Sequence, residues 1–235
     1  MIDIHCHILP AIDDGPKRID ESLRMCRIAA SDGIETIVAT PHINNNYITD
    51  SRDVLKKVKE LNFLLSKEKV NLKILPGNDV YIQPDLLKDI TSGKILTIDD
   101  KKKYIILELP SQSLPFYVEK VIPELKKNKI TAIISHPERN YQIQKNINTV
   151  ERMIKAGALM QITAMSITGE FGSSAQKSAH DLLKKGFVYA IASDAHSVDK
   201  RPPILSKAVD YASDLIDRKD VMKMVCDNPL KIVSS

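Results

Sequence analysis

Two histidines stand one residue apart near the start of the chain, at positions 5 and 7. Apolar and polar residues alternate from Ile2 to His5, a pattern typical of a β-strand. Alternate side chains of a strand point to the same face, so His5 and His7 project together, roughly 6.5–7 Å apart along the strand, and Cys6 points away. Two imidazoles in this arrangement can bind one divalent cation. A surface strand that happens to carry two histidines is the alternative, and the positions of the other histidines and carboxylates decide between the two.

Nine side chains with nitrogen or oxygen donors share one feature, which is their place at or soon after the end of a predicted strand. They are five imidazoles and four carboxylates: His5, His7, Asp14, His42, Asp79, Glu108, His136, Asp194 and His196. No thiolate belongs to the set, so it favours manganese, iron, zinc or magnesium over copper(I) or an iron–sulfur cluster. Nine ligands are too many for one ion, and they fit two or three ions with carboxylates bridging.

Some acidic residues of this region have a simpler interpretation. Either Asp13 or Asp14 could shape the turn that follows the first strand, and we assign Asp14 as the ligand. Asp79 could cap the helix predicted near residue 84, although its place at a strand end favours a metal role. Glu108 ends an apolar strand, where a carboxylate needs a cation as partner. The sixth histidine, His180, falls within a predicted helix and is expected on its surface.

The charge of such a cluster favours a phosphate ester as substrate. Paired divalent ions suit in-line displacement at phosphorus because they stabilise both the attacking and the leaving oxygen. Three ions bring about six positive charges, of which the carboxylates and a bridging hydroxide cancel about five. Arg139 and Arg201 follow His136 and His196 closely. A guanidinium binds phosphate oxygens through two N–H groups, so we expect both arginines to hold phosphate; a surface salt bridge is the alternative for each.

Short apolar strands alternate along the chain with amphipathic helical stretches. The predicted strands span residues 2–6, 35–39, 72–75, 104–109, 131–135, 158–162 and 188–192. The predicted helices lie near residues 21–31, 52–67, 84–92, 115–127, 148–155, 175–184, 203–215 and 220–226. This order predicts an α/β fold with a parallel sheet closed, or nearly closed, into a barrel, with a doubly wound open sheet as the alternative. The carboxyl ends of barrel strands meet at one mouth, where active sites lie and the candidate ligands would converge.

The composition bounds the number of domains and argues against several classes of protein. The 235 residues are 43% hydrophobic, enough for one substantial core, so residues 1–235 are predicted to form one domain. The net charge is +4, but the lysines are scattered and aromatic residues make up only 5%, which argues against a nucleic-acid partner. No apolar run reaches the roughly 18 residues that span a bilayer, so no membrane insertion is expected.

The three cysteines, Cys6, Cys26 and Cys226, are odd in number and far apart in the sequence. This usage is typical of reduced thiols, and we expect a cytoplasmic protein. A phosphatase with a cysteine nucleophile needs an arginine six positions after the cysteine, in the loop that binds phosphate. The residues at those three positions are Ile12, Asp32 and Ile232. A cysteine-nucleophile mechanism is therefore excluded.

Taken together, these residues resemble the PHP superfamily, named for polymerase and histidinol phosphatase domains. Within it, the chain is similar to the bacterial capsule-biosynthesis tyrosine-protein phosphatases. The stretches that carry the resemblance are residues 1–7, 13–16, 40–42, 135–139, 192–196, 201–203 and 227–229. A single His-x-His is a weak motif, whereas the ordered set is specific and covers essentially the whole chain.

The resemblance implies a distorted, TIM-like (β/α)7 barrel with a trinuclear centre, usually of manganese. One ion would take His5, His7, Asp79 and Asp194. The second would share Asp79 and add Glu108 and His136. The third would take Asp14, His42 and His196. Arg139 and Arg201 would hold the phosphate, with Asp194 and His196 as the other residues nearest to the reaction. The family often has a glutamate where this chain has Asp79, and the shorter side chain makes a bridging position harder to reach.

The resemblance also implies a substrate, which is phosphotyrosine in the C-terminal tail of a bacterial tyrosine autokinase that controls polysaccharide export. A phenol with a pKa near 10 leaves easily, so a metal-bound hydroxide could attack phosphorus without a strong general acid. Residues 44–47 and 111–113 are expected near the mouth, either in contact with the peptide or as ordinary exposed loops. A histidinol phosphatase or another small-molecule phosphoesterase would use the same site, and a non-catalytic module that binds metal or a partner is the alternative of another class.

Overall fold

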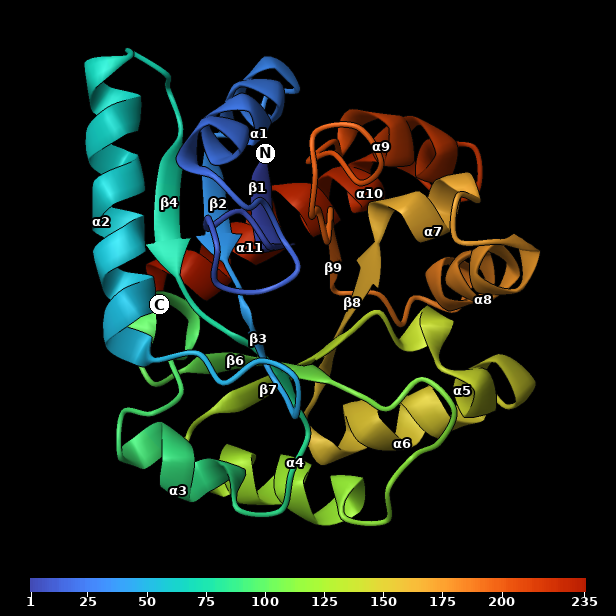
Figure 1. Cartoon of the computed structure of the whole chain (residues 1–235). Coiled ribbons are helices and arrows are strands. Elements are labelled where there is room, and N and C mark those ends of the chain that lie inside the picture. Colours follow the sequence, from blue (N-terminus) through green and yellow to red (C-terminus); the bar gives the residue numbers. More distant parts are fainter.

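Nine strands form two parallel sheets in the computed structural model, which describes residues 1–235 (Figure 1). The smaller sheet has the order β1-β2-β4 and consists of β1 (Ile2–Cys6), β2 (Thr36–Ala39) and β4 (Lys73–Pro76). The larger sheet has the order β3-β5-β6-β7-β8-β9 and consists of β3 (His42–Ile43), β5 (Asp79–Tyr81), β6 (Tyr104–Glu108), β7 (Thr131–Ser135), β8 (Leu159–Thr163) and β9 (Ala190–Ala192). Every pairing is parallel, so the predicted α/β fold with parallel strands is confirmed.

Short interruptions separate β2 from β3 and β4 from β5, and the sequence does not predict β3 or β5. Pro41 lies in the first interruption, and proline has no N–H for a ladder inside a sheet. Asn78 in the second interruption donates from Nδ2 to the carbonyl oxygen of Pro41 at 3.1 Å, which holds the two breaks side by side. A Cβ at Gly77 would lie 3.0 Å from a side-chain carbon of β2, so glycine permits this close approach. Beyond the breaks, His42 pairs with Asp79, and this register carries both side chains into one site.

Closure of the strands into one barrel is not confirmed. Between β1 and the chain beyond β9 there is a single isolated bridge, from Cys6 to Ala195, instead of a regular ladder. Two backbone hydrogen bonds lie beside it, from His7 N to Ala195 O and from Asp194 N to His5 O, both at 2.8 Å. The structure therefore contains two parallel sheets that meet along β1 and the segment after β9, whereas the sequence predicts seven strands closed, or nearly closed, into a barrel.

Two apolar clusters occupy the two faces of the strands. Along β6, Ile105 and Leu107 belong to the larger cluster, which also contains residues of the covering helices. Ile106 between them points the other way, into a smaller cluster. That smaller cluster takes residues from strands of both sheets, among them Ile4 of β1 and Ile133 of β7. The two sheets therefore share one apolar interior although no regular ladder joins them.

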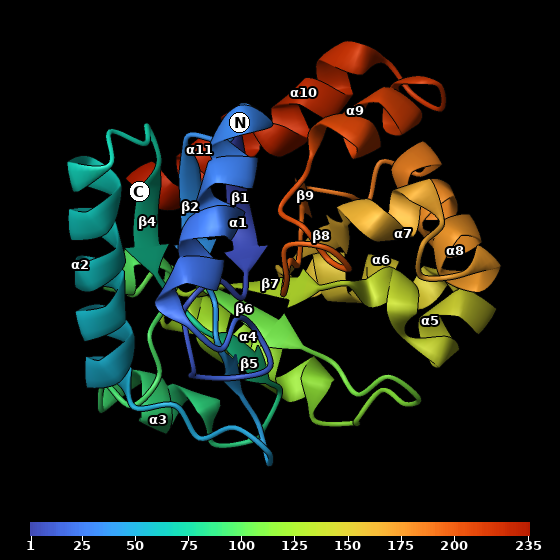
Figure 2. The ribbon, with the colours of Figure 1, turned by 45° about the horizontal axis from the view of Figure 1, so that its top comes forward.

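Helices cover the outer faces of the sheets, as Figure 1 shows. They are α1 (Ile19–Ser31), α2 (Ser51–Lys67), α3 (Leu86–Thr91), α4 (Val118–Lys127), α5 (Tyr141–Lys145), α6 (Asn148–Ala156), α7 (Ala164–Thr168), α8 (Ser173–Lys184), α9 (Ser206–Ser213), α10 (Arg218–Val225) and α11 (Asp227–Ser234). Figures 1 and 2 place α1 and α2 beside the smaller sheet, with α7 and α8 on the opposite side of the molecule. Every helix predicted from the sequence has a counterpart in the structure, whereas the sequence does not predict α5, α7 and α11. A bilayer-spanning helix, both long and apolar, is not found among them.

One side chain, Asn62, fastens α2 to the edge of the smaller sheet. Its Nδ2 donates to the carbonyl oxygen of Ile74 at 2.8 Å, and its Oδ1 accepts from the Ile74 N–H at 2.9 Å. Because β4 is the last strand of this sheet, no further strand is present to bond these backbone groups. Asn62 thus satisfies an edge that would otherwise be left with an unpaired N–H and C=O.

We predict that Asn62→Ala lowers the free energy of unfolding by about 1–3 kcal/mol, because it leaves two backbone groups of Ile74 without partners. Urea denaturation measures this loss. The matched control is Asn128→Ala at the exposed end of α4. This variant removes a side-chain hydrogen bond to Glu124 O and should lower the free energy of unfolding by less than about 0.5 kcal/mol. Equal losses in the two variants would contradict the role given to Asn62.

Candidate metal centre

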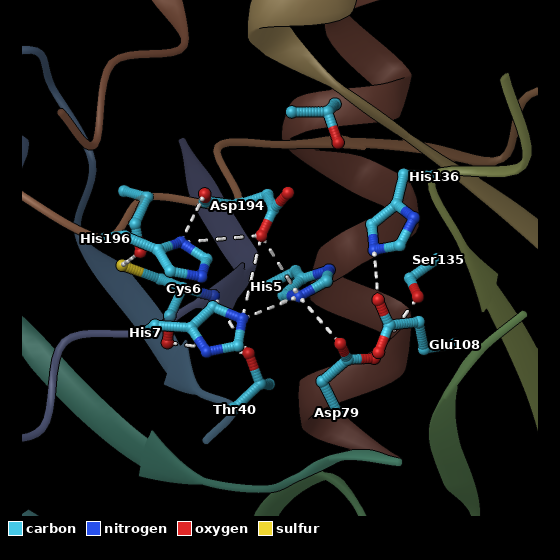
Figure 3. A network of polar contacts seen from close by, with 12 residues as sticks. His5, Cys6, His7, Thr40, Asp79, Glu108, Ser135, His136, Asp194 and His196 are labelled. Carbon is cyan, nitrogen blue, oxygen red and sulfur yellow. Dashed lines mark hydrogen bonds and ion pairs between the residues drawn. The ribbon is translucent and has the colours of Figure 1, made fainter. Parts of the chain in front are cut away.

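The nine side chains predicted as ligands lie together at the carboxyl ends of the strands, and Figure 3 shows most of them from close by. Their donor atoms form four overlapping groups in which all atoms lie within 4.8 Å of one another. The groups are His7, Asp14, His42 and His196; His5, Asp79 and His136; His5, His7 and Asp194; and His42, Asp79 and Glu108. Each of the nine residues belongs to at least one group, so the structure brings the whole predicted set together.

The two histidines of β1 form the middle of the cluster. Both are buried, and their Nε2 atoms lie 3.2 Å apart. Asp194 Oδ1 lies 3.6 Å from each of these nitrogens. Cys6 between them takes no part in these groups, as the alternation of a strand requires.

The second side of the cluster is built by β3, β5 and β6. His42 Nδ1 lies 3.2 Å from Asp79 Oδ2 and 3.7 Å from Glu108 Oε2. His5 Nε2 lies 3.6 Å from the same oxygen of Asp79, and His136 Nε2 lies 3.7 Å from Glu108 Oε1. Asp79 therefore faces two groups of donors in spite of its short side chain.

The third side is the most accessible. Asp14 Oδ1 lies 3.3 Å from His196 Nε2 and 3.7 Å from His42 Nε2, and the rings of His7 and His196 stack with centroids 3.9 Å apart. Asp14 and His196 also line a pocket of about 270 Å³ that opens beside the cluster. On this side the carboxylate of Asp14 is exposed to solvent.

Three hydrogen bonds fix which ring nitrogen of a histidine faces the cluster. Gln161 Oε1 lies 2.8 Å from His5 Nδ1, and Asp13 Oδ2 lies 2.7 Å from His7 Nδ1. The Asp194 carbonyl oxygen lies 2.9 Å from Nδ1 of His196. When Nδ1 donates to such an oxygen, Nε2 is left free to bind a cation, which is the usual support of a metal-binding histidine.

Sequence reasoning did not find these supporting roles. The sequence predicts that Asp13 shapes the turn. Its Oδ1 does accept from Gly15 N at 2.9 Å, while its other oxygen faces His7. Gln161 stands at the end of a strand, and that position was the one signal that it could face the site. His180 lies outside the cluster as predicted, but it is half-buried, with Nε2 2.9 Å from Ile167 O.

The charges around the cluster hold several side chains in the state in which they bind cations. Burial would raise the pKa of Asp14, but the hydrogen bond and charge of His196, with His7 and His42 behind it, lower this pKa to about 2. Burial likewise opposes the charged form of Asp194, yet nearby His5 and Arg201 hold its pKa well below the usual range.

Two imidazoles are kept neutral by the same surroundings. Burial and the neighbouring histidines hold the pKa of His7 well below its ordinary value, and burial with the charge of Arg139 lowers the pKa of His136 to about 3. A neutral imidazole has a free lone pair, which a metal ion requires.

The residues present fit a group of divalent cations. His42 Nδ1 and Asp79 Oδ2 are buried and face each other at 3.2 Å as an ion pair, and neither makes a well-aligned hydrogen bond. Burial opposes the protonated form of His42, but Asp79, Glu108 and Asp14 outweigh it and raise its pKa to about 9. Burial and the charge of Asp79 raise the pKa of Glu108 to about 7. A proton on His42 thus balances part of the negative charge of Asp79, Glu108 and Asp14, which bound cations would balance in its place.

Both predicted arginines lie beside the cluster and face one carboxylate. Arg139 Nη1 donates to Asp194 Oδ2 at 2.7 Å, and Arg201 Nη2 lies 2.6 Å from the same oxygen. Arg201 Nη2 also donates to the Asp194 carbonyl oxygen at 2.7 Å, while its Nε is buried without a partner. These are ion pairs, but they are made with a buried residue of the cluster, which sets them apart from the surface salt bridges considered as the alternative.

One of the two loops expected near the mouth lies directly against the site. The ring of Tyr47 stacks on His42 with centroids 6.1 Å apart and an angle of 17° between the planes. The loop 111–113 is connected to the segment after His136, because Ser111 O accepts from Tyr141 N at 2.8 Å. Contact of either loop with a peptide stays a prediction.

A parallel α/β fold that gathers imidazoles and carboxylates at its strand ends is the arrangement of metal-dependent hydrolases with more than one ion. The profile of the family described as capsular polysaccharide synthesis, CpsB/CapC, matches residues 1–234. The chain belongs to this family, which confirms the resemblance inferred from its motifs.

Two relatives and one solved structure illustrate the similarity. The tyrosine-protein phosphatase YwqE of Bacillus subtilis is 38% identical over 202 residues, which cover 86% of this chain and 79% of the relative. The putative tyrosine-protein phosphatase CapC of Staphylococcus aureus is 36% identical, over 88% of this chain and 81% of the relative. A crystal structure from the work on YwqE and on CpsB of Streptococcus pneumoniae, described there as metal-dependent tyrosine phosphatases, superposes with a TM-score of 0.94 at 34% identity and covers 100% of this chain and 94% of that one.

We predict that Mn²⁺ raises the melting temperature of the chelator-treated protein by about 5–10 °C at a concentration near 100 times the dissociation constant, since a ligand of the native state stabilises it by about 2.7 kcal/mol under that condition. Differential scanning fluorimetry measures the shift. His5→Ala should lose most of it, because His5 belongs to two of the four donor groups.

His180→Ala is the matched control, because it removes a histidine outside the cluster and should keep the full metal-dependent shift. An unchanged shift in His5→Ala would remove that residue from the ligand set.

Proposed function

We propose that the protein is a metal-dependent protein-tyrosine phosphatase of capsular or exopolysaccharide synthesis. The observation that carries the proposal is the meeting of four overlapping donor groups with two arginines on one carboxylate, Asp194. The names of the relatives support the activity, because YwqE is a tyrosine-protein phosphatase at 38% identity. The substrate we propose is phosphotyrosine in the C-terminal tail of a bacterial tyrosine kinase, and the compartment we propose is the cytoplasm.

The cofactor we propose is three divalent ions, with Mn²⁺ preferred. Two of the donor groups support the division implied by the family, namely His5, His7 and Asp194 on one side, and Asp14, His42 and His196, with His7, on another. Glu108 and His136 fall in separate groups that share Asp79, and the distance of 3.7 Å between their donor atoms supports a common ion. A bridging role for Asp79 is supported by its membership of two groups in spite of its short side chain.

Such ions, when bound, supply an activated water and stabilise the attacking and leaving oxygens of the phosphate ester. The chain's own residues do the rest. Arg139 and Arg201 can bind the phosphate oxygens through their remaining N–H groups, because each already faces the cluster. Asp194 holds both arginines with Oδ2 while Oδ1 faces His5 and His7, so one carboxylate fixes the distance between the phosphate-binding and metal-binding sides. Because a phenol has a pKa near 10, it can leave without a strong general acid, so the site needs no such residue.

We also propose that residues 1–235 form one metallophosphatase domain and that its two sheets act as one interrupted, TIM-like (β/α)7 barrel. In this description β2 with β3 forms one barrel strand, and β4 with β5 forms another. The shared apolar cluster and the bridge from Cys6 to Ala195 support it.

The test of the substrate class is hydrolysis of a phosphotyrosine peptide and of histidinol phosphate at equal enzyme and Mn²⁺ concentrations. We predict a higher kcat/KM for the peptide. His136→Ala should fold normally yet lose hydrolysis by about a hundredfold or more, because it removes one donor of the second metal group. Faster turnover of histidinol phosphate would favour the small-molecule phosphoesterase, and no hydrolysis of any aryl phosphate would favour a binding module.

We predict that a chelator abolishes the activity and that iodoacetamide does not. Burial raises the pKa of Cys6 well above its ordinary value and raises that of Cys26 to about 12, so neither forms a thiolate near neutral pH. The measurement is the initial rate with p-nitrophenyl phosphate after each treatment and after Mn²⁺ is restored. Loss of activity on alkylation, with the metal content unchanged, would contradict the metal-dependent mechanism.

A further inference from the structure

One aromatic ring contacts both arginines beside the cluster. The Cζ atom of Arg139 lies 4.6 Å from the centroid of the Phe171 ring, and that of Arg201 lies 5.3 Å from it. Both distances fall within the range in which a guanidinium is attracted to an aromatic ring. Phe171 is half-buried and belongs to none of the donor groups.

The loop that carries Phe171 is fixed on both sides. It runs from Gly169 to Gly172 between α7 and α8, and both glycines have a positive φ, of 99° and 90°. The Gly172 N–H donates to Gly169 O at 2.9 Å, and Gln176 Nε2 donates to Ile167 O at 3.2 Å. The ring is therefore presented from a short, internally bonded turn.

Apart from the ring, the two guanidinium groups are held by one residue, Asp194, whose carbonyl oxygen also accepts from Arg201. Arg139 and Arg201 both reach Asp194 Oδ2, at 2.7 and 2.6 Å. Two cations so close together repel each other, and each long side chain loses about 2 kcal/mol of rotamer freedom when it is fixed. A contact with an aromatic ring holds a guanidinium without using its N–H groups, which lie in the guanidinium plane and stay available. The unpartnered Nε of Arg201 is one such donor.

We infer that Phe171 is a positioning residue that holds Arg139 and Arg201 as one clamp for the phosphate group. The inference rests on the proposed phosphatase function, because it takes the two arginines as the phosphate-binding groups. Phe171 acts through the arginines and needs no contact of its own with the substrate. Nothing in the motifs of the sequence pointed to this residue.

The experiment compares Phe171→Leu and Phe171→Tyr in the Mn²⁺-loaded protein. Calorimetric titration with inorganic phosphate gives the dissociation constant, and p-nitrophenyl phosphate gives KM and kcat. We expect Phe171→Leu to weaken phosphate binding about tenfold and to raise KM similarly, since it keeps the bulk but loses the aromatic face. Phe171→Tyr keeps the ring and should stay within about twofold of the wild type.

A structural role alone is excluded by two controls. The metal content and melting temperature of Phe171→Leu should match the wild type; if this variant does not fold, Phe171→Met takes its place. Phe63→Leu removes an exposed ring of α2, on the opposite side of the molecule from the α7–α8 loop, and should leave phosphate binding unchanged (Figure 1).

A double-mutant cycle tests the route of the effect. In an Arg139→Lys or Arg201→Lys background, Phe171→Leu should weaken phosphate binding by only about threefold, because the ring then holds one guanidinium and a lysine does not present the planar group. An unchanged effect of Phe171→Leu in both lysine backgrounds overturns the inference. So does a rise in KM for the aryl ester with unchanged phosphate binding, which would mean that the ring contacts the substrate directly. Failure of the proposed function is distinguishable, because the wild type would then bind phosphate without hydrolysing any ester.

Discussion

The arrangement of the chain depends on a set of buried donor atoms that it does not fully satisfy by itself. His42 Nδ1 and Asp79 Oδ2 are buried 3.2 Å apart, where an ion pair takes the place of well-aligned hydrogen bonds. Leaving a buried polar atom unpaired costs roughly 1–3 kcal/mol, and buried charges cost more unless they are paired. Apolar residues of similar volume would pack at these strand ends at lower cost, so the polar cluster is explained by what it binds.

The need to bring these polar side chains together also explains the irregular parts of the backbone. The breaks at residues 40–41 and 77–78 end two ladders early, and this places His42 and Asp79 opposite each other beyond the breaks. His136 and Asp194, which follow β7 and β9, have positive φ values of 33° and 51°. Non-glycine residues adopt such values at a cost, and they are concentrated at functional sites, where the surrounding contacts hold them. A more regular pair of sheets would aim these side chains elsewhere.

Much of the site could be predicted from the sequence because its residues follow features that local patterns reveal. Strands are visible as apolar segments, their ends as polar residues, and the donor types of His5, Asp194 and Glu108 limit the chemistry. The residues that support the ligands and the arginines could not be predicted in the same way. Gln161 and Phe171 act through contacts with residues far away in the sequence, and no local pattern gives the direction of a side chain across the fold. Closure of the barrel is not confirmed for a related reason, since it depends on a ladder between β1 and residues 193–195 that amounts to one bridge.

We propose above all that the nine donor side chains surround divalent ions. The most direct measurement is anomalous diffraction, at the manganese absorption edge, from crystals of the protein grown with Mn²⁺. We predict three separate anomalous peaks among the four donor groups, each bounded by imidazole nitrogens and carboxylate oxygens of the nine residues. Peaks only at the molecular surface, or none between these side chains, would contradict it.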